Sequence, residues 1–181
     1  MVKKLVVVFC LIAFSGLAAA FAQEEPIGRM FKTEPVKVYI KEIQNQSGQN
    51  TVTPEILRKA LEQSLNQRRA IKFQVVKTPA ESDVQIAAVI TKYQYLERGP
   101  FKPNPGIGTM LLEAAATASH NYVELAVDYT VTDARGEKQL WQKTISEYIK
   151  KNMTPDESIP LICDAGTRAF VWKCFGKASL K

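Results

Sequence analysis

Residues 121–149, NYVELAVDYTVTDARGEKQLWQKTISEYI, decide the fold class of this chain. Apolar and polar side chains alternate as far as residue 133, which is typical of a half-buried β-strand. The residues placed on one face by this pattern are Val123, Leu125, Val127, Tyr129 and Val131. The DARG segment at 133–136 follows, with a glycine where a turn needs a positive φ. Residues 140–149 alternate again, so the segment predicts a β-hairpin whose apolar face must be covered.

Three further strands are predicted upstream of the hairpin. Residues 36–40 (VKVYI) alternate with period two, and residues 73–76 (FQVV) form a short second strand. Residues 84–96 (VQIAAVITKYQYL) form a long strand. The alternate positions of this long strand that can face one core are Val84, Ile86, Ala88 and Ile90.

A first helix is predicted between the first two strands. Thr53 is the expected N-cap, and Pro54 occupies the first helical position, where proline is tolerated. Its apolar stripe consists of Ile56, Leu57, Ala60, Leu61 and Leu65. The helix is predicted to end near Arg69.

A second helix is predicted near the C-terminus. Thr154 and Glu157 have the spacing of a capping box. Because Pro160 would cost about 3 kcal/mol in a helix interior, the regular helix is predicted to start near Ser158. The expected apolar face consists of Ile162, Ala165, Ala169 and Trp172.

The order of these elements is β-α-β-β-β-β-α, which predicts an α+β fold. We expect a mostly antiparallel sheet of four to five strands with two helices packed on one face. One domain is expected to span residues 36–181, after a flexible lead-in at 23–35.

The first 22 residues have the pattern of a secretory signal peptide. Lys3 and Lys4 precede an apolar run at 5–17, and Ala20-Phe21-Ala22 offers a small-x-small cleavage site. The run is shorter than the ~20 residues that span a bilayer. Cys10 lies inside this run, a position that does not suit a lipidation site. The pattern therefore predicts export, with a soluble mature chain that begins at Gln23.

Charge and cysteine spacing limit the partners and the chemistry. The chain has 24 basic and 18 acidic residues, a net charge of +6 without a block of lysine and arginine, so nucleic acid is not an expected partner. On one helix, Cys163 and Cys174 would lie about 16 Å apart at ~1.5 Å per residue, too far for a disulfide. Either the tail folds back after the helix or both are buried thiols, and the spacing favours buried thiols.

The sequence offers no recognisable catalytic apparatus. His120 is the single histidine and has no evident partner, and no serine or cysteine lies in a nucleophile-elbow motif. Metal-ligand spacing is also missing, and the GIG segment at 106–108 lacks the rest of a dinucleotide-binding motif. We therefore expect no catalytic residue, no metal and no cofactor. A small hydrolase is the disfavoured alternative.

An insertion at 99–121 interrupts the two long strands. It begins with a Pro/Gly loop at 99–108 (GPFKPNPGIG) and continues as a small, apolar, helix-favouring segment at 109–119. Two interpretations remain open. The segment packs on the sheet, or its Met110, Leu111 and Leu112 contact a partner or a membrane.

Three local stretches resemble the LptE family of lipopolysaccharide-assembly proteins. These are VKVYIKEIQNQSG at 36–48 with a following helix that ends in QRR, the ESDVQI…ITKY strand at 81–93, and YVELAVDYTVTDARGEKQLW at 122–141. The resemblance implies a sheet backed by two helices that plugs an outer-membrane β-barrel of the LptD type. It also implies lipopolysaccharide as a ligand and a location at the inner leaflet of the outer membrane.

Basic residues at loops and sheet edges are the candidates for contact with lipid phosphates. They are Arg98, Lys102, Arg135, Lys150 and Lys151, and the alternative for each is an ordinary solvated charge. The alternative function is a stand-alone periplasmic adaptor that joins a different envelope complex through its sheet edge or its insertion.

Overall fold

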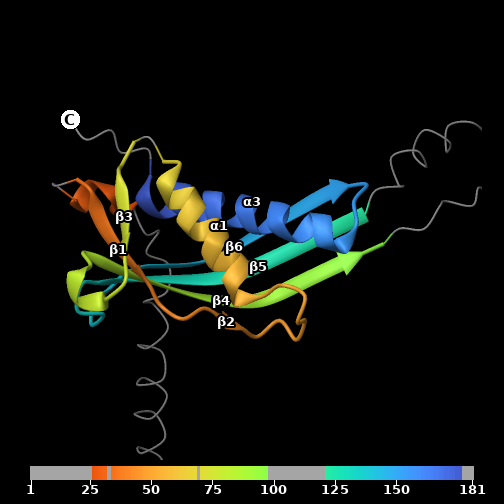
Figure 1. Ribbon diagram of the computed structural model, residues 1–181, viewed down its shortest axis with the longest axis horizontal. Coiled ribbons are helices and arrows are strands. Elements are labelled where there is room, and N and C mark those ends of the chain that lie inside the picture. Colours follow the sequence, from red (N-terminus) through yellow and green to blue (C-terminus); the bar gives the residue numbers. More distant parts are fainter. Residues whose placement is uncertain (1–25, 32–33, 69, 98–120, 177–181) are drawn as a thin grey trace, which may run out of the picture.

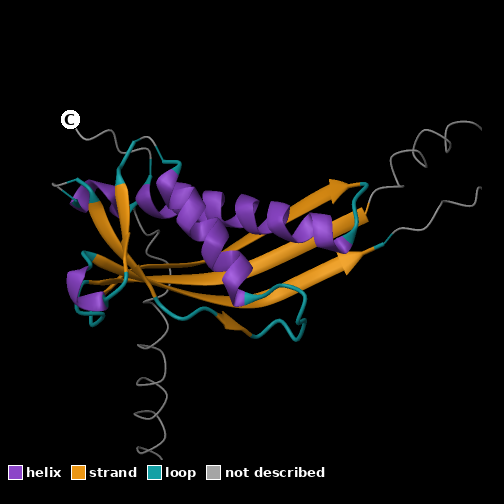
Figure 2. Ribbon diagram, in the orientation of Figure 1, coloured by secondary structure: helices purple, strands orange, loops and turns teal. Residues whose placement is uncertain are grey.

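A computed structural model describes residues 26–31, 34–68, 70–97 and 121–176. Figures 1 and 2 show one twisted sheet with two helices on the same face. The elements are η1 (Ile27–Met30), β1 (Val36–Ile40), β2 (Gln44–Asn45), α1 (Pro54–Asn66), β3 (Phe73–Val76), η2 (Pro79–Glu81), β4 (Val84–Leu96), β5 (Asn121–Asp133), β6 (Gln139–Lys151) and α3 (Pro155–Phe175). The predicted α+β class and element order are confirmed.

The sheet is mixed, whereas a mostly antiparallel sheet was expected. Its order is β3-β1-β4-β5-β6, with β2 beside β4. The β4–β5 and β5–β6 pairs are antiparallel, but β1 runs parallel to both β3 and β4. The helix α1 forms the crossover that a parallel β1–β3 pair requires. Alternation of side chains in the sequence carries no information about this direction.

The predicted hairpin is confirmed as β5 and β6. Cα partners run from Asn121 opposite Lys151 to Thr132 opposite Gln139. In the connecting turn, Gly136 has a φ of 75°, a conformation that glycine adopts without strain. The Asp133 carboxylate accepts hydrogen bonds from the backbone N–H groups of Glu137 and Lys138 and fixes the turn.

The core lies between the sheet and the two helices. All the apolar strand residues that were predicted to share one face are buried, from Val84 to Ile90 in β4 and from Val123 to Val131 in β5. The helix α1 buries Leu57, Ala60, Leu61 and Leu65 and leaves Ile56 half-buried. Its Ser64 hydroxyl lies 2.7 Å from the Thr167 hydroxyl of α3, so a polar contact joins the helices inside the core.

The start of α3 differs from the prediction near Ser158. The capping box is confirmed, because the Thr154 hydroxyl accepts from the Glu157 N–H while the Glu157 carboxylate accepts from the Thr154 N–H. The helix begins directly after it, at Pro155, and Pro160 lies inside the helix. Pro160 and Asp156, whose carbonyl loses its helical partner, are both exposed, so this carbonyl can bond to water.

The buried face of α3 is also rotated from the predicted one. Ile162 is buried as expected, but Ala165 and Ala169 are half-buried and Trp172 is 52% exposed. The true face is centred on Phe170, whose ring stacks on Tyr129 at a centroid distance of 4.0 Å. The helix packs against both the sheet and α1, so its buried surface is wider than one stripe.

Both cysteines lie within α3 and are buried, and no disulfide joins Cys163 to Cys174. This confirms the spacing argument for buried thiols. Burial raises the pKa of the Cys163 thiol to about 12. A thiol of this kind is an apolar filler of the core and not a reactive group.

Part of the segment expected as a flexible lead-in, Ile27–Met30, forms η1. Ile27 is buried, and Gly28 lies directly against the carbonyl oxygen of Phe175, where a Cβ atom would collide. The segment before β1 therefore closes the end of the core near the C-terminus of α3.

Candidate functional site

One end of the sheet gathers the polar and aromatic groups that the core does not use. Here β4 ends at Leu96, β5 begins at Asn121, β6 ends at Lys151 and α3 begins at Pro155 (Figure 1). We call this the strand end of the sheet. Most of the 99–121 insertion lies outside the described residues, as do the candidates Arg98, Lys102, Met110, Leu111 and Leu112.

A partly buried hydrogen-bond network holds the strand end together. The side-chain amide of Asn121 donates to the Tyr95 hydroxyl and to the Met153 carbonyl, both at 2.7 Å. The Tyr95 hydroxyl itself donates to the Met153 carbonyl at 2.9 Å. The network links β4, β5 and the segment before α3. Burial, followed by the nearby carboxylates Glu97 and Glu157, raises the pKa of Tyr95.

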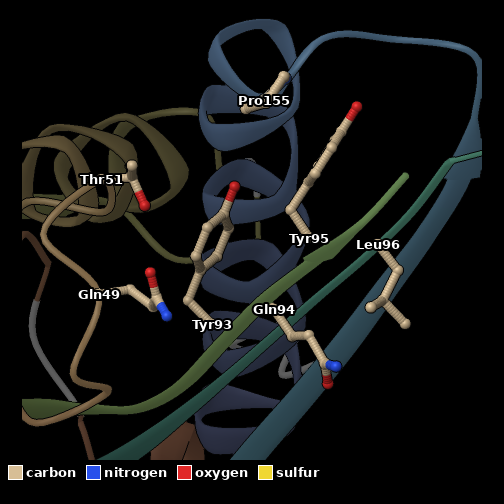
Figure 3. A pocket seen from close by; sticks show the side chains of 7 residues that line it. All are labelled: Gln49, Thr51, Tyr93, Gln94, Tyr95, Leu96 and Pro155. Carbon is tan, nitrogen blue, oxygen red and sulfur yellow. The ribbon is translucent and has the colours of Figure 1, made fainter.

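A pocket of about 290 Å³ lies on the helix side of the strand end. It is lined by Gln49, Thr51, Tyr93, Gln94, Tyr95, Leu96 and Pro155. Figure 3 shows the Tyr93 ring standing up from β4, with its hydroxyl between Thr51 and Tyr95. Gln94 and Leu96 point away from that ring, because successive strand residues face opposite sides of the sheet. We call this the Tyr93 pocket.

The pocket exists because β4 extends beyond β1 and β2, the strands on one of its two sides. β1 and β2 pair with β4 at residues 84–86 and 89–90, and the chain then leaves the sheet at Gln46. In the described part of the chain, the last residues of β4 therefore have a strand beside them on the β5 side alone. A β-bulge between Ile90 and Lys92 bends this extension, and the Thr91 hydroxyl bonds to the Ala126 carbonyl across it.

The opposite wall of the pocket is the loop between β2 and α1. Its shape is set by Asn45, whose side-chain amide donates to the carbonyls of Gln49 and Val52, both at 2.8 Å. The Asn45 carbonyl oxygen accepts from the N–H and the hydroxyl of Ser47. These bonds fix the backbone of the polar QNQSGQNT loop and hold the side chains of Gln49 and Thr51 beside the pocket.

The face of the sheet opposite the helices carries a different cluster at the same end. Leu96 lies opposite Tyr122, and Tyr122 lies opposite Lys150. The rings of Tyr122 and Tyr148 stack with centroids 5.9 Å apart, and the Lys150 ammonium lies 6.0 Å from the Tyr148 centroid. Tyr148 is 64% exposed and Leu96 is 43% exposed. We call Leu96, Tyr122, Tyr148 and Lys150 the tyrosine patch.

The structure separates the basic residues that were candidates for phosphate contact. Lys150 and Lys151 are exposed at the end of β6, whereas Arg135 is exposed in the turn at the other end of the hairpin. Thirteen strand residues at ~3.3 Å each place these ends roughly 40 Å apart. Lys150 and Lys151 also point to opposite faces, since neighbours in a strand alternate. These three residues therefore do not converge on one phosphate group.

The titratable groups with the largest changes lie in the core and not at the strand end. Burial raises the pKa of Tyr129 in β5 and of Cys163 in α3, both of which lie in the core. Among the described residues, no group of three histidine, cysteine, aspartate or glutamate side chains could hold a metal ion. No helix in the described ranges is both long and apolar enough to cross a membrane.

Comparisons with known proteins identify similar folds without a family. No family model and no curated protein matches the chain. A hypothetical protein of Chlamydia trachomatis is 11% identical, with a TM-score of 0.49 over 75% of this chain and 93% of that one. The PelC dodecamer of Paraburkholderia phytofirmans gives 8% identity and a TM-score of 0.46, over 74% and 87%. A Neisseria meningitidis lipoprotein gives 11% and 0.41, over 76% and 99%. Values this low carry no conclusion about function.

The resemblance to the LptE family is wrong. No family model or curated protein supports it, and the similar structures include a PelC protein, a DUF330 protein and lipoproteins. The stretches that suggested it consist of alternating strands and a glycine turn, which many sheets share. An LptD-type barrel and lipopolysaccharide were expected as partners only because of this resemblance, so there is no longer a reason to expect them.

Sequence reasoning missed both features of the strand end. The Tyr93 pocket combines a loop, a strand and a helix start that lie far apart in the chain, and no local pattern joins them. The tyrosine patch did leave a signal. Tyr122 and Tyr148 occupy positions in the hairpin that alternate with buried apolar residues, so both rings had to lie on the polar face.

Proposed function

We propose that this chain is an exported, non-catalytic subunit of a cell-envelope assembly that binds a protein partner through the tyrosine patch. The N-terminal pattern of residues 1–22 supports export, and the periplasm is the compartment that we propose for the folded domain. The lipoproteins among the similar structures are compatible with an envelope location.

The exposure of Tyr148 is the observation that carries the proposal. A tyrosine that is 64% exposed on a sheet face, stacked on a second tyrosine, presents a large and rigid apolar surface to solvent. Tyrosine loses little conformational entropy on binding and is enriched in protein interfaces. Stacking already restrains both rings, so a partner would meet a surface that is ordered in advance.

The surroundings of the tyrosine patch favour a specific protein partner. Outside the patch, the same face is polar, with Gln142, Thr144 and Ser146 exposed along β6. Lys92 and Glu124 form an ion pair at 2.7 Å beside it. An apolar centre with a polar and charged rim has the composition of a protein interface. The patch also lies on regular strands, which favours binding by a rigid surface.

A non-catalytic role agrees with the chemistry of the described residues. The two groups that burial shifts most, Tyr129 and Cys163, are enclosed in the core where no substrate reaches them. The strand end offers amides, hydroxyls and tyrosine rings, which bind molecules but supply neither a nucleophile nor a base at neutral pH.

Site-specific photo-crosslinking in the native cell tests the proposal. A photoreactive residue at position 148 is expected to form one discrete adduct with an envelope protein. The control position is 142, on the same strand and the same face but towards the hairpin turn. Equal adducts from both positions, or none from 148, would contradict a specific interface. Binding of the isolated chain to anionic phospholipid vesicles that Y148S abolishes, without a protein adduct, would assign the patch to a membrane surface instead.

A further inference from the structure

We infer that the Tyr93 pocket binds a neutral, polyhydroxylated ring, such as one sugar unit of a glycan. The pocket lies on the helix side of the sheet and the rings of the tyrosine patch on the opposite face. The two share Leu96 at the end of β4, but this inference uses neither Leu96 nor the proposed function. It is carried by one buried hydroxyl group, by the character of the pocket lining and by the rigidity of the loop beside it.

The buried hydroxyl belongs to Tyr93. This residue is 7% exposed, and its Oη atom is buried without a hydrogen-bond partner among the described residues. Figure 3 shows this hydroxyl at the end of the ring, among the side chains that line the pocket and on the side of Thr51 and Tyr95. A buried polar group without a partner destabilises a fold, so a hydroxyl directed into a pocket is a position at which a ligand can gain a bond.

The other polar groups beside the pocket suit a ligand with several hydroxyl groups. The Gln49 amide and the Thr51 hydroxyl face the Tyr93 ring (Figure 3), and neither side chain forms a hydrogen bond within the described residues. Each can donate and accept, as can the Tyr93 hydroxyl. The apolar part of the lining, the Tyr95 ring and Pro155, can cover the C–H face of a ring. A few convergent polar groups on an apolar wall are typical of small-molecule sites.

The charge of the lining favours a neutral ligand. None of the described residues that line the pocket is acidic or basic. The positive end of the α3 dipole lies nearby at Pro155, which has no N–H group, and the capping box already occupies the N–H groups of Thr154 and Glu157. The adjoining hollow, which shares Tyr95 and Pro155, contains the carboxylates of Glu97 and Glu157. An anionic ligand would therefore be repelled from this side of the pocket.

Size and rigidity limit the ligand further. A volume of about 290 Å³ is at the lower end of the ~300–1,000 Å³ range for ligand sites, which suits one ring and not a folded oligomer. The Asn45 bonds to Gln49 and Val52 hold the loop wall in place before any ligand arrives. A site ordered in advance loses less entropy when it binds.

Binding of three trisaccharides to the full chain, followed by NMR, tests this inference. The probes are the neutral N-acetylglucosamine trimer, the cationic glucosamine trimer and the anionic galacturonic acid trimer. We expect saturable shifts at Gln49, Thr51 and Tyr93 with the neutral trimer, and weaker binding of both charged trimers. A preference for the anion, or no shift at these residues with any probe, would overturn the inference.

The variant Y93F supplies the decisive comparison because it removes the hydroxyl alone. The buried hydroxyl has no partner within the described chain, so Y93F is expected to fold with an unchanged or higher Tm. It should bind the neutral trimer about tenfold more weakly. The control is Y122F in the tyrosine patch, which should bind as the native chain does. Equal affinity of Y93F and the native chain would overturn the assignment of this hydroxyl to the ligand.

Discussion

The two faces of the sheet use tyrosine for opposite purposes. On the helix side, Tyr129 is fully buried and stacks on Phe170, with ring planes only 10° apart. On the open side, Tyr148 stacks on Tyr122 at 22° but remains 64% exposed. Tyr122, Tyr129 and Tyr148 all belong to the β5–β6 hairpin, and the alternation of its strands places Tyr129 on one face and the other two on the opposite face. The helices decide which ring serves stability and which stays available for binding.

This difference predicts where substitutions will act. The covered face contains most of the buried apolar side chains of the strands, which pack in one core with the helices. The open face contributes little burial, so its side chains can change without loss of structure. Paired substitutions at neighbouring or equivalent positions therefore measure how sharply the two faces differ.

The largest difference is expected between two adjacent residues of β6. Ile145 is 1% exposed and faces the helices, so I145D places a carboxylate in the core, costs several kcal/mol and should abolish cooperative unfolding. Ser146 is exposed on the open face, so S146D should change the free energy of unfolding by about 0.5 kcal/mol or less. Thermal and urea unfolding check both. Similar effects would mean that the open face is covered.

Two aromatic residues of α3 give the next comparison. F170A removes the ring that packs on Tyr129 and Trp141 and should cost about 3–5 kcal/mol. Trp172 is 52% exposed, so W172A should cost well under half as much, in spite of the larger side chain. Urea unfolding measures the two changes. A larger cost for W172A would support the helix face inferred from the sequence and contradict the structure.

The antiparallel half of the fold was the predictable half. In β4 and β5 one face is covered by helices and the other is open. The alternation of apolar and polar residues, such as Val127 and Asp128, therefore shows which side chains are buried. The sequence does not indicate that β1 and β3 are parallel, because the relative direction of two strands depends on how they pair in the tertiary structure. In α3, burial against both α1 and the sheet widened the apolar surface. The spacing of apolar residues therefore did not show that Trp172 lies outside this surface, 52% exposed.

The candidate site was less predictable than the fold. Tyr93 follows a β-bulge, which shifts the alternation of β4 by one residue and brings this ring to the helix side. A reading of the sequence with strict period two places Tyr93 on the open face, because its number is odd while Ile86 and Ile90 are even. Gln49 and Pro155 reach the same pocket through the path of the chain, which no local pattern encodes.

An intermediate effect is expected at the network that joins β4, β5 and the segment before α3 at the strand end. N121A removes the side-chain amide that bonds to Tyr95 and Met153, and leaves a buried carbonyl with fewer partners. We expect a loss of about 1–3 kcal/mol. Asn152 is exposed in the same segment, so N152A serves as the control and should be close to neutral. Chemical unfolding measures both. Equal costs would show that the network does not stabilise the strand end.

The smallest effect is expected from acid at the start of α3, which borders both the Tyr93 pocket and the core. The backbone N–H of Thr154 is the first cause that lowers the pKa of Glu157 below its usual value, and the Thr154 side chain adds to it. A carboxyl whose folded pKa is depressed contributes stability that is fully present above its unfolded pKa of ~4.3 and is lost as the pH falls through the folded pKa. We therefore expect the Tm of the native chain to fall more steeply below about pH 4.3 than the Tm of E157Q.

The matched control is D156N, one residue away in the same exposed turn but outside the capping box, and it should keep the native pH profile. If E157Q and the native chain have parallel profiles between pH 3 and pH 7, the capping box does not stabilise α3 and the start of the helix at Pro155 must have another cause.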